Sequence, residues 1–359
     1  MLCLKECMKT IIKYYIWTLI IVCMGFTQTL AENNSNAFLQ KNKGNHQHKI
    51  VDKANRRILI QKPFQRIISL YGAHTENLFC LGLNNEIIGV SLNEAFPPEA
   101  LQKPGFSYHD DPERFLAAKP DLVLIRPMID RAYPQLISRL EKSGIVVVSL
   151  QPNNIHEVYQ YWQTLGHLTG RSEKAQMMIQ NFSSAVKKIE TLSLSISKPK
   201  QVYFEAIHRK MKTFASKAMP IFLLEIVGGI NVASDAKSVR QTNIAYYSKE
   251  KLMAKGSKID VYLAQVGAMN RPKLKDIYQE PGYQVIKAIK NKKVYLIDEM
   301  IVSRPTIRLL NGMLQIGVLL YPDVYCEKGK FIISNALQGF SIDLNRETSG
   351  ICKKQEIVH

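Results

Sequence analysis

Short, continuous hydrophobic runs alternate with amphipathic stretches in the first half of the chain. The runs predict strands at 66–71, 87–91, 121–125 and 145–150. Three helical patterns lie between them. The first ends at Leu81-Gly82, the second begins at Asp111-Pro112-Glu113, and the third covers 133–143. Strands without a polar face, separated by helices, are typical of a parallel sheet that is buried on both sides. This pattern predicts an N-terminal α/β lobe over 56–152.

The same alternation returns in the second half. Strands are expected at 201–206, 230–233, 259–265 and 293–297, with helices at 220–227, 248–255 and 306–320. Pro322 would end the last helix, because proline lacks the backbone donor that a helix needs. We therefore expect a C-terminal α/β lobe over 199–325.

The segment between the two lobes has no strand pattern. Hydrophobic residues recur at helical spacing from Ile155 to about Leu194, with a break at Gly170-Arg171. We interpret 153–198 as a long helical connector, which would limit hinge motion between the lobes.

The two lobes also echo each other in detail. Residues 113–125, a glutamate-led helix followed by an Asp and a strand, resemble 250–263, and 78–84 resemble 224–231 in the same order. Two copies of one α/β unit predict a bilobed protein. Ligands of such proteins bind at the carboxyl ends of the strands, in the cleft between the lobes.

The chain ends differ from the lobes in composition. Lysines precede the apolar run Tyr14–Phe26, and small residues follow it, so 1–31 reads as a secretory signal peptide. An uncleaved membrane anchor is the alternative, and the large Val22 disfavours a lipoprotein site at Cys23. Residues 32–55 are polar and predict a flexible linker, while 326–359 read as a basic, irregular tail.

Composition narrows the class of protein. The formal net charge is +18, but no nucleic-acid-binding motif accompanies it, so an anionic ligand or membrane surface fits better. Cys80 falls on an apolar helix face, and Cys326 and Cys352 flank the tail, where they would be able to pair in an oxidising compartment. No glycine-rich phosphate loop or nucleophile elbow supports an enzyme.

Several of these segments, taken together, resemble the class III periplasmic substrate-binding proteins of ABC importers, the iron–siderophore, haem and vitamin B12 group. The likeness runs from about Arg66 to Tyr325. The segments that show this likeness are 66–70, Thr75-Glu76, Leu81-Gly82, 88–90, 120–124, 228–232, Ser303-Arg304-Pro305, Arg308-Leu309-Leu310 and Gly312. The resemblance implies a two-lobed carrier that has no intrinsic cofactor and delivers its ligand to a permease dimer with its ATPase.

In that family, one glutamate on each lobe docks into arginine pockets of the permease. The matching positions are Glu113 and Glu250, the residues that lead the repeated helices. A carboxylate at a helix N-terminus stays ionised and exposed, which suits such a role. A plain helix-start glutamate on a solvated face is the alternative.

Ligand-facing residues are expected in the loops that follow the strands. The residues singled out are Tyr71, His74, Tyr108, His109, Arg126, His208, Arg209, Met269, Arg304 and Arg308. Arginine grips carboxylate or catecholate oxygens and tyrosine stacks on flat rings, so the set suits a large, partly anionic chelate. By resemblance, Tyr108 matches an aromatic position that contacts the corrin ring in vitamin B12 binders.

Two alternatives apply to individual members of this set. Arg304 and Arg308 would instead cap the last helix or pair with Glu299 or Asp298. His74, His109 and His208 would be able to hold a transition ion or haem iron if they met in one crevice, with Glu205 or Asp111 as an added carboxylate.

The sequence thus predicts a periplasmic, monomeric and non-enzymatic carrier that does not bind nucleic acid. A ferric siderophore is the leading ligand, with haem or cobalamin as the alternative within the same family. A direct transition-metal binder and a membrane-anchored surface receptor are alternatives of another class.

Overall fold

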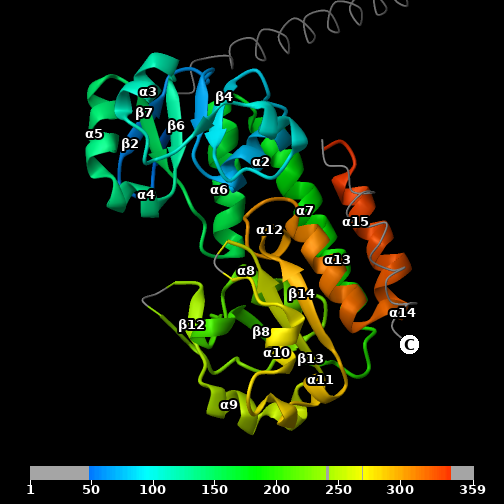
Figure 1. The fold of residues 1–359 in the computed structure, drawn as a ribbon. Coiled ribbons are helices and arrows are strands. Elements are labelled where there is room, and N and C mark those ends of the chain that lie inside the picture. Colours follow the sequence, from blue (N-terminus) through cyan, green and yellow to red (C-terminus); the bar gives the residue numbers. More distant parts are fainter. Residues whose placement is uncertain (1–47, 240–241, 269, 341–359) are drawn as a thin grey trace, which may run out of the picture. The chain divides into compact units, whose positions relative to one another are not determined.

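The computed structural model describes residues 48–239, 242–268 and 270–340 (Figure 1). The predicted signal peptide, most of the predicted linker and the end of the tail lie outside the described residues. From Lys49 onward the chain forms one compact unit. Within the described residues, no helix is both long and apolar enough to cross a bilayer.

The N-terminal lobe is built on a parallel sheet of five strands in the order β5-β4-β3-β6-β7. The strands are β3 (Ile67–Ser69), β4 (Ile87–Ser91), β5 (Gly105–Phe106), β6 (Leu122–Ile125) and β7 (Val146–Ser149). Every residue of β3 and β6 is buried, which confirms the prediction of a sheet covered on both faces.

Helices of this lobe follow the predicted order. They are α2 (Gly72–Cys80), the 3-10 turn η1 (Pro98–Gln102), α3 (Pro112–Ala118), α4 (Pro127–Ala132) and α5 (Pro134–Lys142). The side chain of Asp111 caps α3 by accepting the amide N–H of Glu113, as the Asp-Pro-Glu pattern predicts. Cys80 is buried, as expected, and burial raises the pKa of its thiol to about 12.

The C-terminal lobe contains a mixed sheet. Four of its strands are parallel in the order β10-β8-β13-β14, and they are β8 (Gln201–Ile207), β10 (Ile230–Asn231), β13 (Val261–Val266) and β14 (Val294–Asp298). An antiparallel extension, β9 (Lys212–Phe214), β12 (Ile244–Tyr246) and β11 (Lys237–Ser238), continues from β8. The sequence did not predict this extension, because its strands have only two or three residues each.

Short helices surround this second sheet. They are α8 (Met219–Ile226), α9 (Lys249–Ala254), η3 (Gly256–Lys258), α10 (Leu274–Tyr278), η4 (Tyr283–Val285), α11 (Lys287–Lys290), α12 (Glu299–Val302) and α13 (Leu309–Leu320). The predicted helix at 306–320 begins three residues later than expected, because Arg304 and Arg308 hold the preceding segment in ion pairs.

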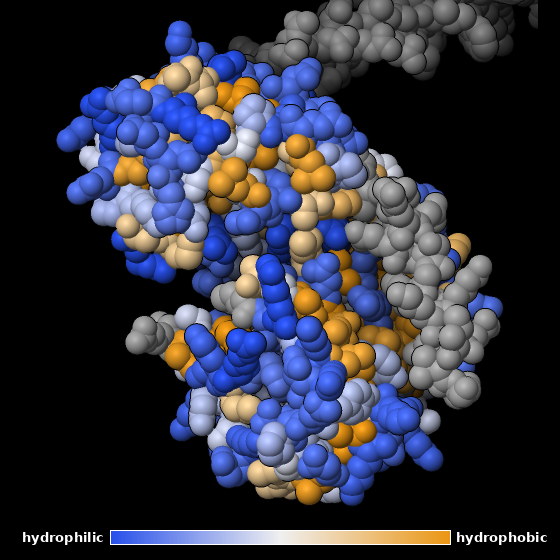
Figure 2. All heavy atoms as spheres, viewed as in Figure 1, coloured by the Kyte–Doolittle hydropathy of each residue, from blue (hydrophilic) through white to orange (hydrophobic). Residues whose placement is uncertain are grey.

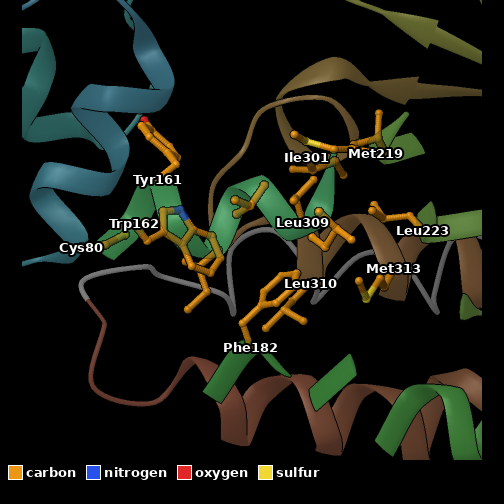
Figure 3. Packing of buried hydrophobic residues seen from close by; sticks show 14 of the residues in the cluster. Cys80, Tyr161, Trp162, Phe182, Met219, Leu223, Ile301, Leu309, Leu310 and Met313 are labelled. Atoms are coloured by element: carbon orange, nitrogen blue, oxygen red, sulfur yellow. The ribbon is translucent and has the colours of Figure 1, made fainter. Parts of the chain in front are cut away.

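The connector consists of two helices that are separated at the predicted break, Gly170-Arg171. Helix α6 (Ile155–Thr169) ends at Gly170, whose φ of 67° suits glycine, and α7 (Ser172–Ser193) folds back along it. The indole ring of Trp162 and the phenyl ring of Phe182 meet edge to face at 5.3 Å. Both side chains are fully buried among residues of α8, α12 and α13, so the connector is part of the main core (Figure 3).

Two predictions about the chain ends are wrong. Strand β1 (His48–Val51) lies inside the predicted linker and pairs with β2 (Arg57–Ile60). Asp52 orders the turn between them by accepting the N–H groups of Ala54, Arg56 and Ser149. A polar composition was read as disorder, but here one buried carboxylate satisfies several backbone donors.

The tail after Val324 is helical where the structure describes it. Helix α14 (Pro322–Val324), the π-helical turn η5 (Tyr325–Gly329) and α15 (Lys330–Leu337) follow α13. Ile333 and Leu337 are buried, and Asn181 of α7 donates its amide to the carbonyl of Ala336. Cys326 is disulfide-bonded, and Cys352 lies outside the described residues, so the pairing of the two cysteines stays a prediction.

Candidate functional site

Tyr71 and Arg126 follow neighbouring strands of the N-terminal sheet. Tyr71 comes directly after Leu70 at the end of β3, and Arg126 comes directly after β6. The Arg126 guanidinium carbon lies 4.7 Å from the centre of the Tyr71 ring, a cation–π contact. Burial raises the pKa of the Tyr71 hydroxyl, while the charges of Arg126 and Arg304 oppose the rise. Both side chains are partly exposed, so this strand end offers a cationic, aromatic surface.

A second aromatic group lies on the same lobe. The rings of Tyr108, His109 and Tyr133 are mutual neighbours, with centroids 4.5 to 5.1 Å apart. The Tyr133 hydroxyl lies 3.0 Å from Nδ1 of His109. Tyr108 and Tyr133 are half-buried and His109 is exposed. These three residues, which we call the aromatic shelf, present ring surface to solvent and suit stacking on a flat, conjugated group.

In the C-terminal lobe, His208 follows β8 and contacts a buried carboxylate. Its Nδ1 lies 2.8 Å from Oε2 of Glu205, which also accepts the hydroxyl of Tyr262. The hydrogen bond that His208 donates to the Glu205 carboxylate raises the pKa of His208, and burial only partly opposes this. A raised histidine pKa stabilises the fold below pH 6.5, and this contribution is lost as the pH rises through the folded-state pKa. His208 is therefore engaged inside its own lobe.

Other residues expected near the ligand on this lobe have different placements. Arg209 is exposed, and Met269 lies outside the described residues. Asn270 is buried, where its side chain accepts the amide of His208 and donates to the carbonyl of Gln265. Asn270 thus fastens the loops after β8 and β13 to each other.

Arg304 and Arg308 form a buried ion cluster with Glu76 of α2. Their Nη1 atoms lie 3.1 and 3.3 Å from the two carboxylate oxygens, and Glu76 is only 1% exposed. Burial raises the pKa of Glu76, against the opposing effect of the two guanidinium groups. Neither predicted role is confirmed, because these arginines pair with Glu76 rather than with Glu299 or Asp298, and little of either side chain is free for a ligand.

The surrounding contacts make this cluster the junction between the lobes. Both the amide of Asn77 and the indole N–H of Trp162 donate to the carbonyl of Pro305, at 2.9 and 3.1 Å. A side chain on Gly72 would place its Cβ 2.3 Å from Nη1 of Arg304, so it would displace this guanidinium group from Glu76. The Arg308 guanidinium also stacks on Phe96, 4.2 Å from its ring centre.

The prediction that His74 faces a ligand is wrong. Its side chain is fully buried, with Nδ1 2.6 Å from the hydroxyl of Tyr161 and Nε2 3.1 Å from the carbonyl of Ile125. A carbonyl only accepts, so Nε2 carries the proton and the Tyr161 hydroxyl donates to Nδ1. Burial lowers the pKa of His74 to about 4, and the ring is neutral at pH 7.

The three candidate metal ligands do not meet. His74 lies in the core, His109 belongs to the aromatic shelf and His208 is paired with Glu205. Among the described residues, no group of three or more His, Cys, Asp and Glu side chains is arranged to hold a metal ion. Helix α2 begins at Gly72, two residues before His74, and the His74 side chain is buried within it.

Glu113 and Glu250 occupy equivalent places on their lobes. Each lies in the first turn of a short helix, behind a capping Asp111 or Ser248. Glu113 pairs with Arg139 at 2.9 Å, although both side chains are more than half exposed. Glu250 is exposed, and hydrogen bonds to its carboxylate, first from its own backbone amide and then from Ser248, lower its pKa. Both carboxylates are therefore presented to solvent.

Sequence reasoning missed two important residues. Tyr133 was read only as the start of a helix, and no local signal pairs it with Tyr108 and His109, which are more than twenty positions away. Glu76 was quoted within Thr75-Glu76, but a carboxylate on a helix gives no sign that it will be buried. Two arginines late in the chain, in an otherwise apolar segment, were the signal that a buried acid had to exist.

Comparison with known proteins identifies the family. Residues 67–300 match the periplasmic binding protein family, and the chain belongs to it. It is 27% identical over 284 residues to an uncharacterised ABC transporter substrate-binding lipoprotein of Bacillus subtilis, covering 77% of this chain and 87% of that one. It is 23% identical to the vitamin B12-binding protein of Vibrio cholerae, over 73% of this chain and 92% of that one.

Solved structures agree with this assignment. A possible iron-binding, periplasmic solute-binding protein of Staphylococcus epidermidis superposes with a TM-score of 0.63 at 25% identity, covering 72% of this chain and all of that one. A periplasmic haem-binding protein of Roseiflexus has a TM-score of 0.61 at 19% identity, over 72% of this chain and 99% of that one. At that identity the second likeness shows the fold alone.

Proposed function

We propose that this protein is the substrate-binding component of an ABC importer and carries a metal–organic chelate. The observation that carries the proposal is the family match over 67–300, which includes both α/β lobes. The chain acts by binding and delivery, without chemistry of its own. Its N-terminal segment directs it to the periplasm, where it works as a monomer.

The ligand class follows from the side chains that remain accessible. Arg126 and Arg209 supply positive charge, and Tyr71 and the aromatic shelf supply ring surface. A ferric siderophore combines anionic oxygens with rings or extended chelating arms, which matches both features. Haem or cobalamin is the second candidate. The aromatic shelf favours it, because three adjacent rings suit a flat macrocycle.

Delivery depends on the paired glutamates. Glu113 and Glu250 are exposed carboxylates at helix N-termini, one on each lobe, and would enter basic pockets of a permease dimer. Two separated charges fix the orientation of docking better than one, because both must be matched together.

A titration tests the ligand assignment. Purified protein would be titrated with a ferric catecholate siderophore, a ferric hydroxamate siderophore, haemin and cyanocobalamin, with absorbance and intrinsic fluorescence as readouts. We expect one of them to bind, with Kd at least about tenfold higher in Arg126→Ala, since a hydrogen bond to a charged group contributes about 1.5–3 kcal/mol. Tyr108→Ala should weaken binding as well.

Matched variants control for surface changes. Arg171→Ala and Tyr278→Ala remove an exposed arginine before α7 and a half-buried tyrosine at the end of α10, on the side of the strand starts rather than the strand ends. They should bind like the wild type. The proposal is rejected if none of the four chelates binds, or if the Arg126 and Tyr108 variants keep the wild-type affinity for the one that does.

A further inference from the structure

A groove with a volume of about 530 Å³ lies between α7 and α15. It is separate from the strand ends that carry the candidate ligand-binding residues. The two helices lie alongside each other, held by the Asn181–Ala336 hydrogen bond (Figure 1). Lys187, Lys188 and Leu192 line this α7–α15 groove from one helix, and Lys328, Phe331 and Ile332 line it from η5 and α15. Its volume is within the usual range for ligand-binding sites.

The charge of the groove is entirely positive. Lys187, Lys188 and Lys328 are exposed, and no acidic residue is among the lining side chains. The lysines that form ion pairs within the described part of the chain lie elsewhere, at 53, 249, 251, 255 and 287. None of these three ammonium groups forms an ion pair with a carboxylate in the described part of the chain, which makes the groove attractive to anions.

Hydrophobic side chains project from the same surface. Phe331 is 69% exposed, and Leu194, at the end of α7 and two helical turns after Lys187, is 81% exposed. Ile333 and Leu337, on the opposite side of α15, are buried against the core, which keeps Phe331 directed outward. Elsewhere, hydrophilic residues cover most of the face seen in Figure 2, with hydrophobic residues in small groups.

We propose that the α7–α15 groove docks on an anionic phospholipid bilayer. The lysines would contact headgroup phosphates, while Phe331 and Leu194 enter the boundary between headgroups and acyl chains. Lysines beside an exposed aromatic residue are typical of interfacial binding. A bilayer fits better than a soluble anion, because the apolar side chains protrude from the surface instead of lining a closed cavity.

This surface would hold the carrier close to the membrane that contains its permease. It does not depend on which chelate is carried, and it uses none of the residues assigned to the ligand or to permease docking. Failure of the membrane proposal would therefore leave the carrier function intact.

Vesicle binding tests the proposal on the full chain. Co-sedimentation would be measured with phosphatidylcholine vesicles and with vesicles that also contain phosphatidylglycerol. Lys187→Gln/Lys188→Gln/Lys328→Gln should lower the affinity for the anionic vesicles on the order of 100-fold, since each lysine near an anionic surface contributes about fivefold. The control Lys62→Gln/Lys142→Gln/Lys258→Gln removes the same charge from exposed lysines elsewhere and should bind like the wild type.

A depth measurement provides the second readout. Phe331→Trp should give added fluorescence that brominated phosphatidylglycerol quenches, whereas Leu101→Trp, at a position 61% exposed on the N-terminal lobe, should not be quenched. Equal binding of the groove variant and its control would overturn the proposal, since attachment would then come from the N-terminal segment or from net charge. Stoichiometric binding of a fluorescent fatty acid without vesicles, lost in the groove variant while vesicle binding is kept, would identify a soluble amphiphile site instead.

Discussion

At the scale of single residues, burial decides which polar groups serve structure and which face solvent. His74, Glu76, Arg304 and Arg308 lie at the carboxyl ends of strands or near them, where ligand contacts were expected. All four find protein partners instead, because a buried polar or charged group without a partner is costly. Arg126 and the aromatic shelf stay accessible and retain the proposed role.

His74 makes the fold sensitive to acid. Its pKa falls from about 6.5 in the unfolded chain to about 4 in the folded one, so the folded state resists protonation. The stability from His74 is complete above pH 6.5 and is lost as the pH falls toward 4, about 3 kcal/mol in total. Urea unfolding of the wild type and of His74→Gln at several pH values should show this difference. Parallel pH profiles would contradict it.

The Glu76 cluster predicts a large effect of a small change. Glu76→Gln removes the negative charge that Arg304 and Arg308 share. The two buried guanidinium groups then lack a charged partner, which should lower the free energy of unfolding by about 3–5 kcal/mol. Glu113→Gln is the matched control, because its ion pair with Arg139 is exposed and contributes about 1 kcal/mol at most. Urea titrations of both variants compare the two, and similar small losses would mean that the cluster is not an essential junction.

At the scale of elements, hydrophobic patterns located the central strands and helices well. The strand predicted at 87–91 is β4, and the break at Gly170 separates α6 from α7. Short or polar elements were missed, including β1, the antiparallel strands β9, β11 and β12, and α15. Their few residues carry too little periodicity, and contacts from distant segments stabilise them.

Helix α15 should contribute to stability through its buried face. Ile333 is 1% exposed, so Ile333→Ala should lower the free energy of unfolding by about 2–5 kcal/mol. Phe331→Ala, on the exposed face of the same helix, should change it by about 0.5 kcal/mol or less. Thermal or urea unfolding distinguishes the two. Equal effects, large or small, would mean that α15 is not packed by this face.

At the scale of the whole molecule, one core extends through both α/β lobes and includes the connector helices and α13, while each lobe has a further hydrophobic cluster of its own. The internal repeat and the match to the periplasmic binding protein family both extend over these lobes. The lobes are not copies in detail, since the first sheet is fully parallel and the second carries an antiparallel extension. The elements that carry Glu113 and Glu250 are retained in both.

Charge reversal of both glutamates tests delivery apart from binding. Glu113→Lys/Glu250→Lys should reduce uptake of the bound chelate into cells by about tenfold or more, because like charges would meet in the permease pockets. Ligand affinity in vitro should be unchanged. Glu173→Lys/Glu327→Lys makes the same charge change at other exposed positions and should support normal uptake. Normal uptake by the first variant would exclude the docking role.

The sequence by itself determined the class of fold, because continuous apolar strands, their helices and the internal repeat are local patterns repeated in order along the chain. It also determined the capped helix starts at Asp111 and Ser248, where a side chain bonds to a neighbouring amide. Only the tertiary structure decided that Glu76 takes both arginines, that His74 is buried, and that Tyr133 joins Tyr108 and His109. These outcomes depend on residues far apart in the chain, whose meeting is set by packing.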